Sequence, residues 1–270
     1  MMKSELQDKL RTLADKYECP SFCDQDPSQF LQHYKSVPDA LVADTEAASF
    51  IAAMLAFGSR SQFIPKINEI LQMADSFSGT ISKWLAGGRF KKDFPHGDKK
   101  FYRFYSYDDM QIFFEELAGI IKKSGSMGEY FRKEWEGAGS TPTSSAPQTD
   151  SLPQIISSSF PKSRIVPKGK NSANKRIHMF LRWMVRQNSP VDLGIWSWYP
   201  QSELLIPLDV HVMQQAIELG LIPENATASN KTARLLTEQM KPIFPGDPGR
   251  ADYALFGLGV SGASGVAEKI

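Results

Sequence analysis

The sequence is poor in cysteine and has no long apolar run. Its two cysteines, Cys19 and Cys23, are too few for a disulfide framework or a four-thiolate cluster. They stand four residues apart with no second pair or histidine nearby, which argues against a metal site. No segment approaches the ~18 consecutive apolar residues that a membrane-spanning helix needs, and the N-terminal stretch lacks the apolar centre of a secretory signal. We therefore expect a cytoplasmic protein with reduced thiols, no metal and no membrane contact.

The formal net charge of +1 conceals an uneven distribution of charge along the chain. Segment 161–186 holds eight Lys or Arg and no acid, whereas segment 187–230 holds five acids and no Lys or Arg. A basic stretch of this kind suits the phosphate backbone of a nucleic acid even in a nearly neutral protein. A solvated surface face explains the same clustering equally well.

Apolar residues recur at helical spacing through most of the chain, which predicts an all-α fold. Segment 44–57 opens with Asp44 as an N-cap, ends before Gly58 and is apolar nearly all round, as expected of a buried helix. The same periodicity appears in three further segments, 62–75, 108–123 and 175–187. Alternating strand patterns are absent; the nearest candidate, FYRFYSY at 101–107, fits an aromatic-rich helix or loop equally well.

Residues 137–153 are rich in Gly, Ser, Thr and Pro and resemble an exposed, flexible connection. They divide the sequence into an N-terminal helical region, 1–136, and a C-terminal helical region, 154–270. We expect two packed helical lobes with a cleft between them. The tail contains GLGVSG, but this stretch lacks the strand–turn–helix context of a dinucleotide loop, and DYALFGLG predicts a short helix packed on the core.

The stretch from Pro161 to Gln187 indicates a helix, a Pro- and Gly-containing hairpin, and a second helix that starts near Ser172. Asn171 or Ser172 can cap that second helix. Backbone amides, a helix N-terminus and cations together form a phosphate site. The candidate DNA-binding residues of this hairpin are Lys168, Gly169, Lys170, Asn171, Ser172, Asn174 and Arg176.

Lys175 falls in the first turn of the second helix. An ordinary lysine, with a pKa of ~10.4, is a poor nucleophile because it is protonated at neutral pH. A helix N-terminus and the neighbouring cations Lys170 and Arg176 disfavour the ammonium form, and burial would do so further, which favours Schiff-base chemistry. Alternatively, Lys175 is one more cation of the basic stretch.

Asp209 follows Pro207 and precedes a helix that we expect over residues 210–219, so it falls at the N-cap. Capping alone would explain an aspartate there. A functional interpretation adds a second role, in which the carboxylate faces developing positive charge. His211 could contact phosphate or cap alongside Asp209, and a structural histidine fits the sequence as well.

These residues carry a resemblance to the helix-hairpin-helix DNA glycosylase superfamily. A hairpin followed by a (V/L)D-x-(H/R)-V turn and an LGL helix end is typical of endonuclease III-like glycosylases, and the chain has LDVHV at 208–212 and LGL at 219–221. The Asn174-Lys175 helix opening, with Lys175 34 residues before Asp209, is similar to archaeal 8-oxoguanine glycosylases. The chain as a whole resembles an uncharacterised bacterial family known only as a domain of unknown function, whereas the glycosylase likeness covers about residues 160–222.

The resemblance implies a DNA repair glycosylase with AP-lyase activity on oxidised purines such as 8-oxoguanine. Lys175 would attack the sugar C1′ of a flipped nucleotide and form a Schiff base, and Asp209 would activate the lysine and stabilise oxocarbenium-like charge. A flipped base needs an aromatic-lined pocket. Candidates for its walls, each of which could equally belong to the core, are Phe57, Ser59, Arg60, Phe180, Trp196 and Trp198.

Several features depart from the family pattern. The hairpin PKGKNSAN lacks the usual Gly-x-Gly loop, and the missing four-cysteine cluster excludes the iron–sulfur branch. Near-neutral charge predicts weak nonspecific DNA binding. We expect a monomer that binds damaged duplex or abasic-site DNA and needs no cofactor. The alternatives are a nucleic-acid-binding relative that excises no base, and an all-helical interaction protein whose basic stretch meets an acidic partner.

Overall fold

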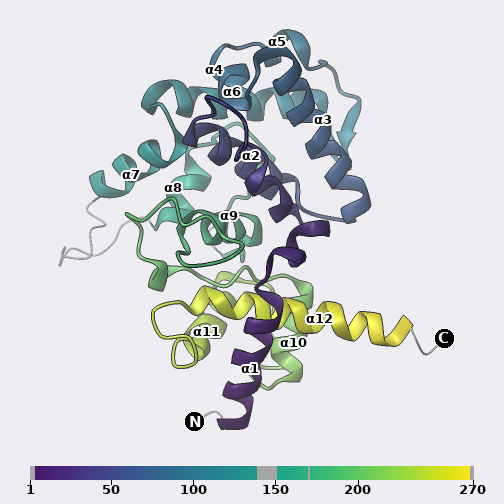
Figure 1. The fold of residues 1–270 in the computed structure, drawn as a ribbon, viewed down its shortest axis with the longest axis vertical. Coiled ribbons are helices and arrows are strands. Elements are labelled where there is room, and N and C mark those ends of the chain that lie inside the picture. Colours follow the sequence, from purple (N-terminus) through teal and green to yellow (C-terminus); the bar gives the residue numbers. More distant parts are fainter. Residues whose placement is uncertain (1–3, 139–150, 170, 268–270) are drawn as a thin grey trace. The chain divides into compact units, whose positions relative to one another are not determined.

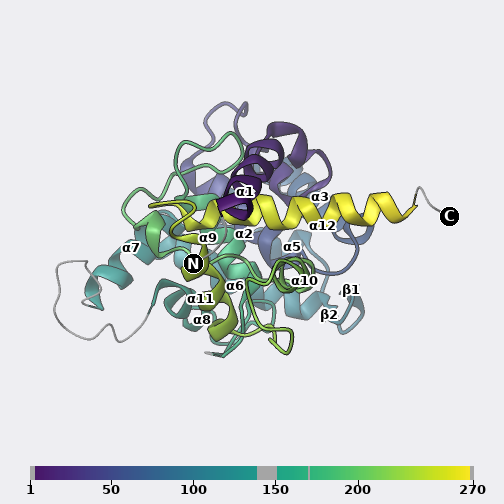
Figure 2. The same cartoon turned by 90° about the horizontal axis from the view of Figure 1, so that it is seen from below.

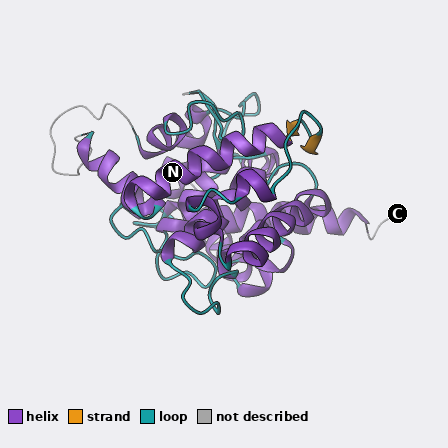
Figure 3. Ribbon diagram, turned by 90° about the horizontal axis from the view of Figure 1, so that it is seen from above, coloured by secondary structure: helices purple, strands orange, loops and turns teal. Residues whose placement is uncertain are grey.

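The chain is built from helices joined by irregular segments. The computed structural model describes residues 4–138, 151–169 and 171–267. Within these ranges the secondary structure is helical apart from one short antiparallel pair of strands (Figures 1 and 3). The predicted all-α class is therefore confirmed.

The chain divides into two compact units. Residues 25–168 form the first, which we call the central unit, while residues 1–24 and 169–270 together form the second, the discontinuous unit. The sequence predicted boundaries near 137 and 153 instead. The difference arises because the N-terminal helix packs on the C-terminal one, a contact that no local sequence signal records. Most of the predicted connection, residues 139–150, lies outside the described residues.

The central unit contains the predicted helices over 44–57, 62–75 and 108–123, which the structure confirms as α2, α3 and α6. The 3-10 helix η1 (Pro20–Gln25) precedes it, and all of η1 but its last residue belongs to the discontinuous unit. The elements that follow are η2 (Pro27–Gln32), α2 (Val42–Leu55), α3 (Arg60–Ser78), α4 (Ile81–Ala86), α5 (Phe90–Asp93), β1 (Lys100–Tyr102), β2 (Tyr105–Ser106), α6 (Tyr107–Ser124), α7 (Met127–Gly137) and α8 (Leu152–Ser158).

Helix α2 is buried almost all round, as its composition predicted, but it begins two residues before Asp44. The fully buried Asp44 carboxylate accepts hydrogen bonds from the amides of Leu41 (2.7 Å) and Ser82 (2.8 Å). Glu46, also buried, accepts from the amides of Met127 and Gly128, at the start of α7. Two carboxylates of α2 thus satisfy amides at the first turns of three helices, which stabilises negative charge in the interior of this unit.

The FYRFYSY stretch forms a hairpin and then the start of α6, rather than a helix or a loop. Strands β1 and β2 pair antiparallel, with Tyr102 opposite Tyr105, around a two-residue loop of Arg103 and Phe104. Arg103 adopts a left-handed backbone conformation, with φ of 49°. The tight turn requires this conformation. The two strands have only three and two residues, too few for an alternating pattern to predict them from the sequence.

The discontinuous unit confirms the predicted helices over 175–187 and 210–219 as α9 and α10. Its elements are α1 (Ser4–Tyr17), α9 (Lys175–Val185), η3 (Gln201–Glu203), α10 (Val210–Glu218), α11 (Asn230–Met240), η4 (Pro248–Arg250) and α12 (Ala251–Ala267). The expected short C-terminal helix is a longer one, because α12 continues to Ala267.

Helix α12 is the helix of the discontinuous unit on which α1 and α10 pack. Figures 1 and 2 show α1 crossing it, and α10 packs against it as well. The shared core includes Leu10 of α1, Val212 and Ala216 of α10, and Ala254 and Leu255 of α12. Contacts of this kind between segments far apart in the sequence bury the apolar faces that short helices cannot bury alone. Among the described residues, no helix combines the length and apolarity needed to cross a bilayer.

Candidate active site

Asp209 is the N-cap of α10, as the sequence predicted. Its backbone is extended, with φ of −113° and ψ of −175°, and its Oδ1 accepts a hydrogen bond from the Val212 amide at 2.9 Å. The preceding Leu208 and the following Val212 are both buried in the core. The cap hydrogen bond fixes the carboxylate, and the buried residues before and after Asp209 anchor its backbone.

Lys175 is the first residue of α9, directly after the N-cap Asn174. Asn174 is buried and left-handed, with φ of 43°, and its Nδ2 donates to the Gly169 carbonyl at 3.0 Å. Beyond Arg176 the helix is buried through to Val185. Only the first turn of α9 thus reaches solvent, and Lys175 lies in that turn.

The predicted start of this helix near Ser172, with Asn171 or Ser172 as the cap, is wrong. Ser172 forms an isolated bridge with Ser229, and the Asn171 carbonyl accepts a hydrogen bond from the Asn230 amide at 2.9 Å. The segment before α11 therefore holds these residues in an extended conformation. This pairing delays the helix to Lys175 and fixes the direction from which the chain enters it.

The two residues singled out from the sequence form an ion pair. The Nζ of Lys175 lies 3.1 Å from the Oδ2 of Asp209, while the Oδ1 of Asp209 holds the cap. The side chains are 32% and 17% exposed, so the pair is partly desolvated yet open to solvent. This distance is within direct reach for proton transfer between the two groups. Chemically, the arrangement offers an amine, a carboxylate that can take its proton, and two helix N-termini.

The other residues predicted to bind DNA are spread over both units. Gly169, Asn171 and Ser172 are exposed, Arg176 is partly exposed beside Lys175, and His211 is exposed in the first turn of α10. Lys168 belongs to the central unit, where its ammonium donates to the carbonyls of Phe160 (2.7 Å) and Pro161 (2.8 Å). The remaining predicted residues are Asn174, which is buried, and Lys170, which lies outside the described residues.

The basic stretch over 161–186 is divided between the two units, and part of it is buried. Arg182 and Arg186 are buried, with 4% and 2% exposure, and the remaining described cations divide between the two units at Gly169. The predicted helix-hairpin-helix is divided at the same place, because α8 belongs to the central unit and α9 to the discontinuous one. The linear charge run therefore overstates the surface charge.

The predicted base-pocket residues are also divided between the two units. Phe180 and Trp196 are buried and meet edge to face at 5.2 Å, so both serve the core and neither offers an open ring face. Trp198 is partly exposed and stacks on Trp196 at 5.4 Å. The other three candidates, Phe57, Ser59 and Arg60, lie in the central unit.

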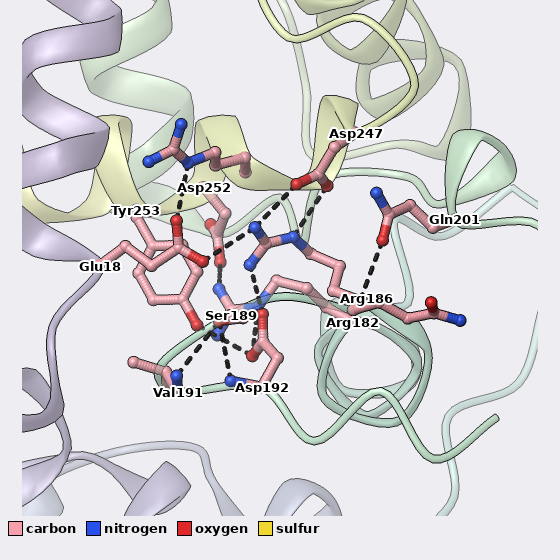
Figure 4. Close-up of polar contacts among 12 residues, drawn as sticks. Glu18, Arg182, Arg186, Ser189, Val191, Asp192, Gln201, Asp247, Asp252 and Tyr253 are labelled. Atoms are coloured by element: carbon pink, nitrogen blue, oxygen red, sulfur yellow. Dashed lines mark hydrogen bonds and ion pairs between the residues drawn. The ribbon is translucent and has the colours of Figure 1, made fainter. Parts of the chain in front are cut away.

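A buried network of charges lies along α9, and the sequence did not reveal it (Figure 4). Arg186 makes a two-pronged contact with Asp247, with both distances 2.8 Å, and also pairs with Asp192 and with Glu18. Arg182 pairs with Asp252. Because each arginine is desolvated, its charge persists only through these partners, and removing one partner would be costly.

Asp252 connects this network to the Lys175–Asp209 pair. The pKa of Asp252 is raised to about 6, chiefly by burial; Arg182 and Lys175 act against this rise, and the negative charge of Asp209 contributes to it. Lys175 and Arg182 stand seven residues apart on α9, two turns along the same face. Their partners come from α10 and α12. The signal that could have found this network is an arginine, Arg182, on the apolar stretch of α9, with a second arginine four residues later at its C-cap.

Residues 26–261 match the family model described as "Protein of unknown function (DUF2400)", so the chain belongs to this family. The matched range includes Lys175, Asp209 and Asp252. No curated protein and no solved structure matches the chain. The family description assigns no activity, so the relationship to helix-hairpin-helix glycosylases stays a prediction from the sequence.

Proposed function

We propose that the protein is a DNA glycosylase with AP-lyase activity that acts through Lys175 and Asp209. The observation that carries the proposal is the 3.1 Å ion pair between these residues, at the starts of α9 and α10. An ion pair without a function at a protein surface usually joins two flexible side chains. Here Asp209 is fixed by its cap, and Lys175 emerges from a helix whose entry is pinned by a buried asparagine.

In this mechanism the Lys175 ammonium first gives a proton to Asp209, and the free amine attacks C1′ of an extruded nucleotide. The new C–N bond forms as the bond from C1′ to the base breaks, and the base leaves with the electron pair and takes up a proton. Opening of the sugar ring produces a Schiff base, and loss of a C2′ proton then breaks the C3′–oxygen bond. The proton that the base takes up is the one that Asp209 received, and the carboxylate regenerated in this way stabilises positive charge on the sugar. Oxidised purines such as 8-oxoguanine are the proposed substrates.

Borohydride trapping on an oligonucleotide with one abasic site tests this function. The wild-type protein should give a covalent adduct, and Lys175→Ala should abolish it. Lys241→Ala is the matched control, because Lys241 belongs to the same unit and also pairs with a carboxylate, Glu238, at 2.6 Å. Asp209→Asn should keep the cap, since asparagine caps well, yet lower the trapping rate by about 100-fold or more.

The outcome also separates the alternatives. Unchanged trapping in Lys175→Ala contradicts the assignment of the nucleophile. Intact DNA binding without any adduct supports a relative that binds nucleic acid but excises no base. Binding of neither duplex nor single-stranded DNA at low salt supports an interaction protein instead. A duplex with a single 8-oxoguanine then tests the proposed substrate class.

A further inference from the structure

The β1–β2 hairpin of the central unit presents an exposed aromatic ring beside exposed cations. Phe104, in the two-residue loop, is 51% exposed. Arg103 is exposed next to it, as are Lys100, at the start of β1, and Lys99, directly before that strand. The acids nearest in sequence, Asp98 and Asp108, lie at the base of the hairpin, where Asp108 accepts a hydrogen bond from the Gly97 amide.

The exposed ring is held in a defined orientation. Phe104 contacts the rings of Tyr105 at 4.6 Å and Phe57 at 5.3 Å, while Phe57 also packs on Tyr102 at 5.0 Å. The Tyr102 hydroxyl donates to the Phe57 carbonyl, which ties the hairpin to the end of α2. The ring is therefore presented by a packed cluster rather than by a free loop.

The conformation of Arg103 is strained. A left-handed residue at the first position of such a loop is ordinarily glycine, and an arginine there costs about 1 kcal/mol or more. The guanidinium lies 5.9 Å from the Phe57 ring centroid. Gly58, with φ of 82°, makes room for it, because a Cβ at this position would lie 2.6 Å from an Arg103 Nη1. One strained residue and one obligatory glycine thus hold an exposed cation beside an exposed ring.

We propose that this hairpin binds single-stranded nucleic acid, with an unpaired base stacked on Phe104 and the adjoining phosphates contacted by Arg103, Lys99 and Lys100. Base stacking on an aromatic side chain combined with cations along the backbone is the usual chemistry of sequence-tolerant single-strand binding. A projecting ring suits the face of a base better than it suits a peptide side chain, which needs a pocket. The surface lies in the central unit, so the inference stands independently of any chemistry at Lys175.

Fluorescence anisotropy with a labelled oligo-dT of about 15 nucleotides at low salt tests the proposal, and an oligo-rU of equal length distinguishes DNA from RNA. Phe104→Ala should weaken binding by at least about fivefold, as expected for the loss of one stacked base. The matched control is Phe77→Ala, because Phe77 is 54% exposed in the same unit and also lies beside an arginine, Arg89, at 5.5 Å. This control should leave the affinity unchanged.

Arg103→Gly separates binding from folding. Glycine relieves the left-handed strain, so the variant should unfold at the same temperature as the wild type or a higher one. Its affinity should nevertheless fall several-fold, and the slope of log K against log salt should drop by about 0.7, the loss of one phosphate contact. Equal affinities for Phe104→Ala and Phe77→Ala, or no wild-type binding to either oligonucleotide at low salt, would overturn the proposal. The proposal would also be overturned if a poly-glutamate peptide bound as tightly as the oligonucleotides and Phe104→Ala left the affinity for that peptide unchanged.

Discussion

Asp252 and His178 are buried titratable side chains of the discontinuous unit whose pKa values shift in opposite directions. Burial raises the pKa of Asp252 to about 6, although Arg182 acts against this rise. Burial lowers the pKa of His178 to about 4, and the positive charge of Arg234 lowers it further. The His178 Nε2 has no hydrogen-bond partner among the described residues, so nothing there stabilises its protonated form.

These shifts give the two groups opposite effects on stability. Asp252 binds its proton more tightly in the folded than in the unfolded chain, so its contribution is complete below its ordinary pKa of 3.8 and is lost as the pH rises through about 6. His178 binds its proton less tightly when folded. Its contribution is complete above 6.5 and is lost as the pH falls toward 4. Between pH 4 and 6 the two contributions largely cancel.

We predict that Asp252→Asn and His178→Leu unbalance the pH dependence in opposite directions. The free energy of unfolding lost in Asp252→Asn should be larger at pH 4 than at pH 7, and that lost in His178→Leu smaller, each by on the order of 3 kcal/mol. Urea unfolding at three pH values measures both. Losses that are the same at every pH would contradict the predicted shifts.

At the scale of elements, the contact between α1 and α12 depends on a single glycine. A Cβ added at Gly257 would lie 2.2 Å from the Tyr17 ring, a distance that no packed side chain can tolerate. At Gly259, in the same helix, a Cβ would meet Gln215 at 3.5 Å and His211 at 3.6 Å, which are ordinary contacts. The helix can therefore accept a methyl group at one of these positions and not at the other.

We predict that Gly257→Ala destabilises the protein by about 1–3 kcal/mol, because steric overlap outweighs the better helix propensity of alanine. Gly259→Ala should stabilise it by about 0.5–1 kcal/mol, because only the propensity changes. Thermal unfolding of both variants measures the difference. Equal effects of the two substitutions would contradict close packing of Tyr17 of α1 on Gly257 of α12.

At the scale of the whole molecule, residues from both ends of the chain share one core. Leu10 of α1 is fully buried among residues of α10, α11 and α12. Glu18, just after α1, pairs with Arg186 and Arg250. Burial alone would raise the pKa of Glu18, but Arg186 and the hydrogen bond from Arg250 outweigh it and lower that pKa. The N-terminal segment is therefore an integral part of the discontinuous unit.

We predict that Leu10→Ala weakens this unit selectively. The substitution should cost about 2–4 kcal/mol, and native-state hydrogen exchange should show the loss at the slowest amides of α9, α11 and α12 but not at those of α2 and α6. Met110→Ala, a fully buried change in α6, should give the opposite pattern. Loss of protection confined to α1 would mean that this helix frays by itself, and equal loss in both units would mean that they unfold together.

The sequence by itself determined the all-α class, the extents of the main helices and the position of Asp209 as an N-cap. These features depend on residues within about four positions of one another, because helical periodicity and capping are local. For the same reason the start of α9 was misplaced, since the bridge from Ser172 to Ser229 that delays it joins residues 57 positions apart.

Only the tertiary structure decided which charges are surface charges and which segments belong together. Arg182 and Arg186 read as part of a basic stretch but are buried, since most of their acidic partners, Asp252, Asp247 and Glu18, come from segments remote in sequence. The N-terminal helix joined the C-terminal unit because burial of apolar area depends on proximity in space and not on order in the chain. The spacing of Lys175 and Asp209 predicted a shared site, and it took the folding of the discontinuous unit to bring their charged atoms to 3.1 Å.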